Sequence, residues 1–140
     1  MERRKFIAQV GTGTLASCAA IPVIANNLEY SDRNSGMPLL EKEEVQHMVI
    51  FDLSHPKGSA EAEKFLNDGR KILSKIPVVQ NFQVFNQVSL KNDYSYGFSM
   101  VFKDQPAYAT YNTHPDHVAF VENRWKKEVT RFLEIDFKAH

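Results

Sequence analysis

The residues best suited to acid–base chemistry gather in one short segment, Tyr111 to His117, which reads Tyr-Asn-Thr-His-Pro-Asp-His. An imidazole has a pKa near neutrality and can remove a proton alpha to a carbonyl group. A phenol can hold and polarise a carbonyl oxygen. Pro115 interrupts any helix between Tyr111 and His117, so the resulting turn is expected to bring both side chains toward the opening between helix and sheet. His47, at the start of the first predicted strand, is a third candidate.

Each candidate also has a purely structural interpretation. His117 can pack against or cap a second helical segment, and Tyr111 can be a core aromatic residue with its hydroxyl group satisfied. His47 can be a strand residue hydrogen-bonded to His117 or to the backbone. His114 fits the role of a turn determinant, and Asp116 fits the N-cap of a helix that begins at His117.

The composition excludes several function classes. The chain has 140 residues, with 17 basic and 17 acidic side chains, so it has no net field to attract nucleic acid. Cys18, the one cysteine, lies in a predicted leader, which excludes disulfides and Cys-ligated metals from the mature domain. His47, His114 and His117 lack the helical spacing and the carboxylate typical of a zinc site, so we predict no metal and no cofactor.

The N-terminus has the features of an export signal. Arg3-Arg4-Lys5-Phe6-Ile7 precedes a mildly apolar stretch that ends at Ala25, a pattern that resembles the twin-arginine motif. We predict a signal peptide over 1–25, a linker over 26–44, a folded domain over 45–140, and a periplasmic location. Cleavage after Ala25 is one route, and lipidation of Cys18 to give a lipoprotein is another. A transmembrane anchor is a third interpretation, weakened by Pro22 and two glycines in the apolar stretch.

Hydrophobic periodicity predicts an α+β domain. Strands are predicted over 47–53, 78–88, 94–103 and 129–137, and helices over 59–75, 107–112 and 118–127. Ser59 is expected to cap the first of these helices, and Asp104 with Pro106 suits the start of the second. The order is β-α-β-β-α-β, the ferredoxin-like arrangement, with the helices on one face of the sheet. Apolar residues occur on both faces of the strands, so a second copy of the chain is expected to cover the open face and form a homodimer.

These elements, together with the Tyr-x-x-His-Pro-x-His segment at 111–117, resemble the Dabb family, the stress-responsive dimeric α/β-barrel domains. The match runs in order from Gln46 to Phe137. The resemblance implies two ferredoxin-like sheets packed face to face. One branch of the family, that of olivetolic acid cyclase, performs a cofactor-free aldol condensation, and its catalytic positions correspond to Tyr111, His117 and His47.

Three functions follow as hypotheses. The first is an exported binding module that holds a small apolar or aromatic molecule between sheet and helices. The second is a cofactor-free acid–base enzyme, cyclase-like or lyase-like, with His117 as base, Tyr111 as carbonyl orienter and His47 as support. The third is a non-catalytic dimer active in stress tolerance.

Overall fold

A computed structural model of the protein describes residues 39–140, and the structural statements below refer to this part of the chain. The leader predicted over 1–25, Cys18 included, and most of the linker predicted over 26–44 lie outside the described residues. Residues 39–44 contain a turn, and the first strand begins directly after them. Within 39–140, no helix combines the length and the apolar character that a membrane span requires.

The domain is built on one antiparallel sheet in which the strands lie in the order β2-β3-β1-β4. The strands are β1 (Val45–Leu53), β2 (Gln80–Asn86), β3 (Tyr96–Phe102) and β4 (Val129–Phe137). Burial along β1 alternates strictly between buried and half-buried residues, as expected for a strand with two different faces. This order confirms the predicted ferredoxin-like fold.

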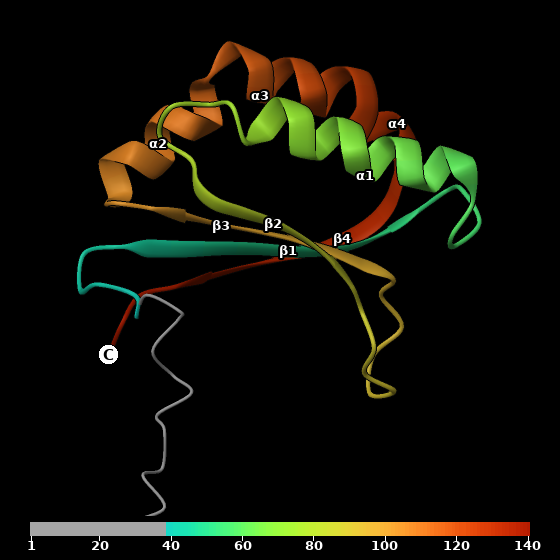
Figure 1. The fold of residues 1–140 in the computed structure, drawn as a ribbon, viewed down its shortest axis with the longest axis horizontal. Helices are drawn as coiled ribbons and strands as arrows, with labels where there is room; N and C mark the ends of the chain where they lie inside the picture. The colour runs from blue at the N-terminus through green and yellow to red at the C-terminus, as the bar shows by residue number, and fades with distance from the viewer. Residues whose placement is uncertain (1–38) are drawn as a thin grey trace, which may run out of the picture. The chain divides into compact units, whose positions relative to one another are not determined.

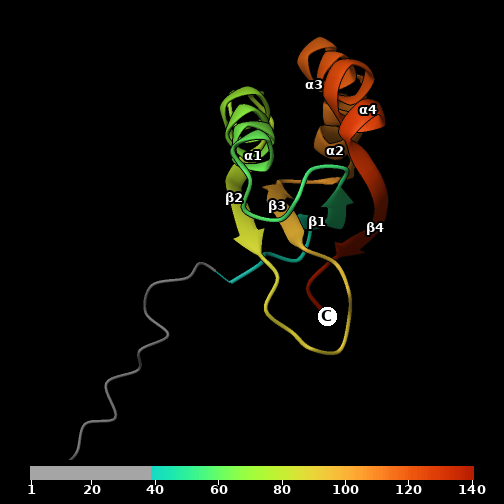
Figure 2. The same ribbon diagram turned by 90° about the vertical axis from the view of Figure 1, so that its right-hand side faces the viewer.

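All helices lie on one face of the sheet, as Figures 1 and 2 show. The first crossover is α1 (Ala60–Leu73). The second is broken into α2 (Gln105–Thr113), α3 (Pro115–Phe120), the π-helix η1 (Val121–Trp125) and the short α4 (Lys126–Glu128).

Helix α1 begins where the sequence predicts and packs unusually close to the sheet. The Ser59 hydroxyl accepts a hydrogen bond from the Ala62 N–H at 3.2 Å, which confirms Ser59 as the N-cap. A Cβ atom added at Gly69 would lie 2.8 Å from Cζ of Phe98. Glycine at this position therefore lets α1 approach the aromatic core of β3. A larger residue here would push α1 away from the sheet.

The start of α3 differs from the prediction. Asp116 was expected to cap a helix beginning at His117, but α3 begins at Pro115 and its cap is His114, whose Nδ1 accepts a hydrogen bond from the Asp116 N–H at 3.2 Å. Proline suits the first helical position because its φ is already helical and it has no N–H to satisfy. The helix therefore starts two residues earlier than the prediction. By contrast, Asp104 caps α2 as expected.

No helix or strand of the described chain covers the face of the sheet opposite the helices (Figure 2), and apolar residues lie in the centre of that face. The register pairs Ile50 with both Gly97 and Leu133, and Met48 with Ile135. Leu133 and Phe137 are each 48% exposed. An open apolar surface of this kind marks an interaction site in soluble proteins.

Candidate functional site

A cavity of about 340 Å³ lies between the sheet and the helices, and the three residues singled out from the sequence, His47, Tyr111 and His117, all line it. Its remaining wall is mainly apolar and aromatic, and includes Val49, Leu73, Phe98, Met100, Phe120 and Trp125. Small-molecule sites typically have this size and this combination of apolar wall and few polar groups.

Tyr111 and His117 face each other across the break between α2 and α3. Their ring centroids lie 4.2 Å apart. Nδ1 of His117 lies 3.2 Å from the backbone carbonyl oxygen of Asn112. A carbonyl oxygen can only accept, so in the neutral imidazole Nδ1 carries the proton and Nε2 remains the basic nitrogen.

Burial keeps both groups neutral. It lowers the pKa of His117 below the ordinary value of 6.5, and the backbone carbonyl of Asn112 and the charge of Glu134 offset this only in part. Burial also raises the pKa of Tyr111 well above its ordinary value of 10.0. At neutral pH the site therefore presents an uncharged imidazole that can accept a proton and an intact phenol that can donate a hydrogen bond.

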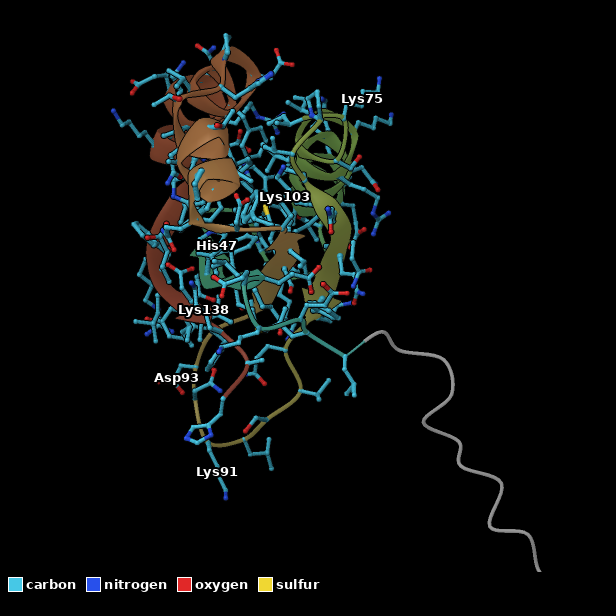
Figure 3. All side chains as sticks on the ribbon, turned by 90° about the vertical axis from the view of Figure 1, so that its left-hand side faces the viewer. His47, Lys75, Lys91, Asp93, Lys103 and Lys138 are labelled. Atoms are coloured by element: carbon cyan, nitrogen blue, oxygen red, sulfur yellow. The ribbon has the colours of Figure 1, made fainter. Side chains whose placement is uncertain are left out.

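His47 belongs to a separate hydrogen-bonded group on the floor of the cavity. Figure 3 shows it on the sheet below the helical layer. The residue is 5% exposed, and its Nδ1 lies 2.6 Å from Oδ1 of Asp136 and 3.0 Å from the hydroxyl group of Tyr108. The expectation that His47 bonds to His117 or to the backbone was therefore wrong. A carboxylate only accepts, so Nδ1 donates to Asp136 and, in the neutral ring, Nε2 is the acceptor.

Asp136 and Tyr108 could not be predicted as partners of His47, because the first contact depends on strand register and the second on the placement of α2 over the sheet. Asp136 lies 89 positions after His47 and directly opposite it in the β1–β4 pair. Tyr108 reaches the same nitrogen from α2. Burial, followed by the charge of Asp136, raises the pKa of Tyr108 to about 12. The one available signal was the alternation of β4, which puts Phe132, Glu134 and Asp136 on the helix-facing side.

His114 and Asp116 lie outside the cavity lining and serve the start of α3 instead. This agrees with the interpretation of His114 as a turn determinant. No group of three or more His, Cys, Asp or Glu residues within 39–140 lies in a position to hold a metal ion. The arrangement is suited to proton transfer and hydrogen bonding to a bound organic molecule.

Comparison with known proteins gives a consistent result. The model of the family described as "Stress responsive A/B Barrel Domain" (Dabb) matches residues 45–139. A Dabb family protein with a ferredoxin-like fold from Mesorhizobium loti is 52% identical, with a TM-score of 0.68, and the match covers 69% of this chain and 97% of that chain. No curated protein sequence matches the chain.

Two more distant structures share the fold. A dimeric protein of unknown function from Bacteroides fragilis is 19% identical, with a TM-score of 0.56, and the match covers 71% of this chain and 99% of that one. A hydroxynitrile lyase from Passiflora edulis is 8% identical, with a TM-score of 0.62 and coverage of 71% and 96%. At these identities the likeness concerns the fold alone.

The state of His117 leads to a first prediction. Histidine protons followed by NMR are expected to titrate at a pH below 6.5 for His117, because burial disfavours its charged form. The unfolded chain then binds a proton at His117 more tightly than the folded chain does. His117 therefore makes its full contribution to the free energy of unfolding above pH 6.5, and this contribution is lost as the pH falls below 6.5.

Glu134→Gln is expected to lower the pKa of His117 further, because the Glu134 charge favours the imidazolium. Glu61→Gln, which changes an exposed carboxylate on α1 outside the cavity lining, is the control and should leave the pKa of His117 unchanged. A His117 pKa at or above 6.5 would contradict the burial argument.

Proposed function

Because the chain belongs to the stress-responsive A/B barrel (Dabb) family, we propose that its domain binds a small apolar or aromatic molecule in the cavity between the sheet and the helices. One observation carries this proposal. The rings of Tyr111 and His117, whose centroids lie 4.2 Å apart, and the ring of His47 all line a single cavity of about 340 Å³ with a largely apolar wall. An unfilled apolar cavity lowers the stability of a fold, so a purely structural dimer would gain nothing from it.

Acid–base catalysis in the same cavity is the second candidate. It is favoured by the orientation of His117, whose Nδ1–H donates to the Asn112 carbonyl and leaves Nε2 as a neutral base. Tyr111 supplies a protonated phenol beside it for a carbonyl oxygen. In such a reaction His117 takes a proton alpha to the carbonyl, and Tyr111 stabilises the developing enolate. The resemblance of 111–117 to the olivetolic acid cyclase branch supports this role.

We also propose that the protein is exported. The twin-arginine pattern at Arg3-Arg4 supports delivery to the periplasm, as a lipoprotein if Cys18 is lipidated. Export also argues against a thioester-bound polyketide as the ligand, since such intermediates are usually held inside the cell. A free aromatic compound is the better candidate.

We also propose that the chain forms a homodimer. Its support is the apolar open face around Ile50, Leu133 and Phe137, together with the dimeric state of a structure that shares the fold. Two copies joined through this face would bury it and form a closed barrel-like assembly of two sheets.

Ligand binding can be tested by thermal shift. A panel of small neutral aromatic compounds is expected to include at least one that raises the melting temperature of the purified protein. At a free concentration of about 100 Kd the gain is about 2.7 kcal/mol. In His117→Ala this gain should fall sharply, whereas Val118→Ala, an exposed neighbour outside the cavity lining, should keep it. A panel that stabilises neither protein would favour the structural role.

Proton transfer can be tested with a simple ketone. Para-methylacetophenone incubated with the protein in deuterium oxide is expected to lose its acetyl proton signal faster than in buffer, as measured by NMR. A positioned general base contributes roughly 10² to 10⁴ in rate, so His117→Ala should remove most of the acceleration, and Tyr111→Phe should reduce it. Exchange that is equally fast in His117→Ala would argue for binding without catalysis by this pair.

Dimerisation can be tested on the open face. Ile50→Glu places a charge in the middle of the apolar patch and is expected to yield a monomer by size-exclusion chromatography with light scattering, since a buried unpaired charge is strongly unfavourable. Val118→Glu, on an exposed surface of α3, is the matched control and should remain dimeric. A wild-type protein that is itself monomeric in this measurement would contradict the proposed homodimer.

A further inference from the structure

Glu134 is an acidic residue on the cavity wall that the proposed chemistry does not use. It lies on β4 opposite Val49 of β1, between Phe132 and Asp136 on the helix-facing side. Its side chain is exposed, and within residues 39–140 its carboxylate makes no hydrogen bond or ion pair with another protein group. The neighbouring carboxylate of Asp136, by contrast, is bonded to His47.

The position of Glu134 brings its charge close to the other polar groups of the site. Its charge contributes to the raised pKa of Tyr111 and acts in the same upward direction on the pKa of His117. The Glu134 side chain is exposed, so water supplies its hydrogen-bond donors while the cavity is empty. A ligand that fills the cavity displaces this water, and the carboxylate then needs a donor from the ligand to avoid the cost of desolvation.

The charges around Glu134 decide which donor fits. Lys126 also lines the cavity, and its ammonium group pairs with Glu122 of η1. A cationic ligand would be attracted by Glu134 but repelled by Lys126. A neutral hydroxyl group can donate to the carboxylate without that repulsion, and a hydrogen bond to a charged group is stronger than one between neutral groups.

We therefore infer that Glu134 is a specificity-determining residue that accepts a hydrogen bond from a neutral hydroxyl group of an aromatic ligand, a phenol or an enol. The inference rests on the proposed binding function and narrows its ligand class. Tyr111 and His117 would contact a different part of the same molecule. Replacing Glu134 should then change which ligands bind while leaving the cavity able to bind the aromatic body.

Three probes of nearly equal size separate the alternatives: para-cresol, para-methylanisole and para-methylbenzylamine. All three have a methyl-substituted ring. Para-cresol carries a hydroxyl donor, para-methylanisole carries an ether oxygen without a donor, and para-methylbenzylamine carries an ammonium group. Their Kd values would be measured by NMR titration on the purified protein, on Glu134→Leu and on Glu134→Gln. Glu61→Gln is the control, because it removes an exposed carboxylate on α1 that neither lines the cavity nor pairs with a cavity residue.

The wild-type protein and Glu61→Gln are expected to bind para-cresol about tenfold or more tightly than para-methylanisole, the ratio typical of a hydrogen bond to a charged group. In Glu134→Leu the two should bind about equally, with the anisole at least as tight as in the wild type. Glu134→Gln retains an acceptor oxygen and should keep part of the preference.

A preference for para-cresol that survives in Glu134→Leu would overturn the inference, and so would tightest binding of the amine to the wild type. In both cases the binding proposal itself would stand, because the anisole still reports on the cavity. If no probe perturbs the signals of cavity residues in the wild type, the proposed function fails, and the inference fails with it.

Discussion

The position of the cavity depends on the break in the second crossover at His114 and Pro115. A residue before proline is pushed out of the helical region, and His114 has the extended ψ of 133° that this restriction favours. The chain therefore stops α2 at Thr113 and starts α3 in a new direction. Because of this turn, Tyr111 at the end of α2 meets His117 of α3, with no helix passing between them.

Further along the same crossover, the π-helix η1 changes which residues face the sheet. A π turn inserts an extra residue per turn, and such insertions often occur at functional sites. Val121, Trp125 and Lys126, from η1 and its junction with α4, all line the cavity. The helical layer thus closes the cavity with an apolar wall and one cation, while β1, β3 and β4 supply its floor.

Much of the fold could be predicted because it depends on patterns among residues that are close together in the sequence. The alternation of β3, the apolar stripe of α1, and the caps Ser59 and Asp104 each depend on residues a few positions apart. The convergence of His47, Tyr111 and His117 on one cavity also followed from the sequence, though with the help of a family resemblance. The cap of α3 was wrongly assigned to Asp116 because the preference of proline for the first helical position was not applied to Pro115.

The rest of the site depends on contacts that only the folded chain defines. The pairing of His47 with Asp136 requires the exact register of β1 against β4, and a shift by one residue would turn Asp136 to the other face. The same holds for Glu134 opposite Val49. The approach of Tyr108 to His47 depends on the angle at which α2 crosses the sheet. None of these is visible in spacing or composition.

Strand β4 contributes side chains both to the cavity wall and to the open face of the sheet. Its side chains alternate, so Glu134 and Asp136 face the helices while Leu133 and Ile135 face the open side. The strand lies at the edge of the sheet and is paired on one side only, with β1. An edge strand is the least constrained part of a sheet, yet this one carries the carboxylate that orients His47. A second copy packed against Leu133 and Ile135 would hold β4 from the opposite face, and would thereby fix the position of both acidic residues. In the proposed dimer, assembly and the geometry of the cavity would therefore be linked through a single strand, and the open face would support the site structurally.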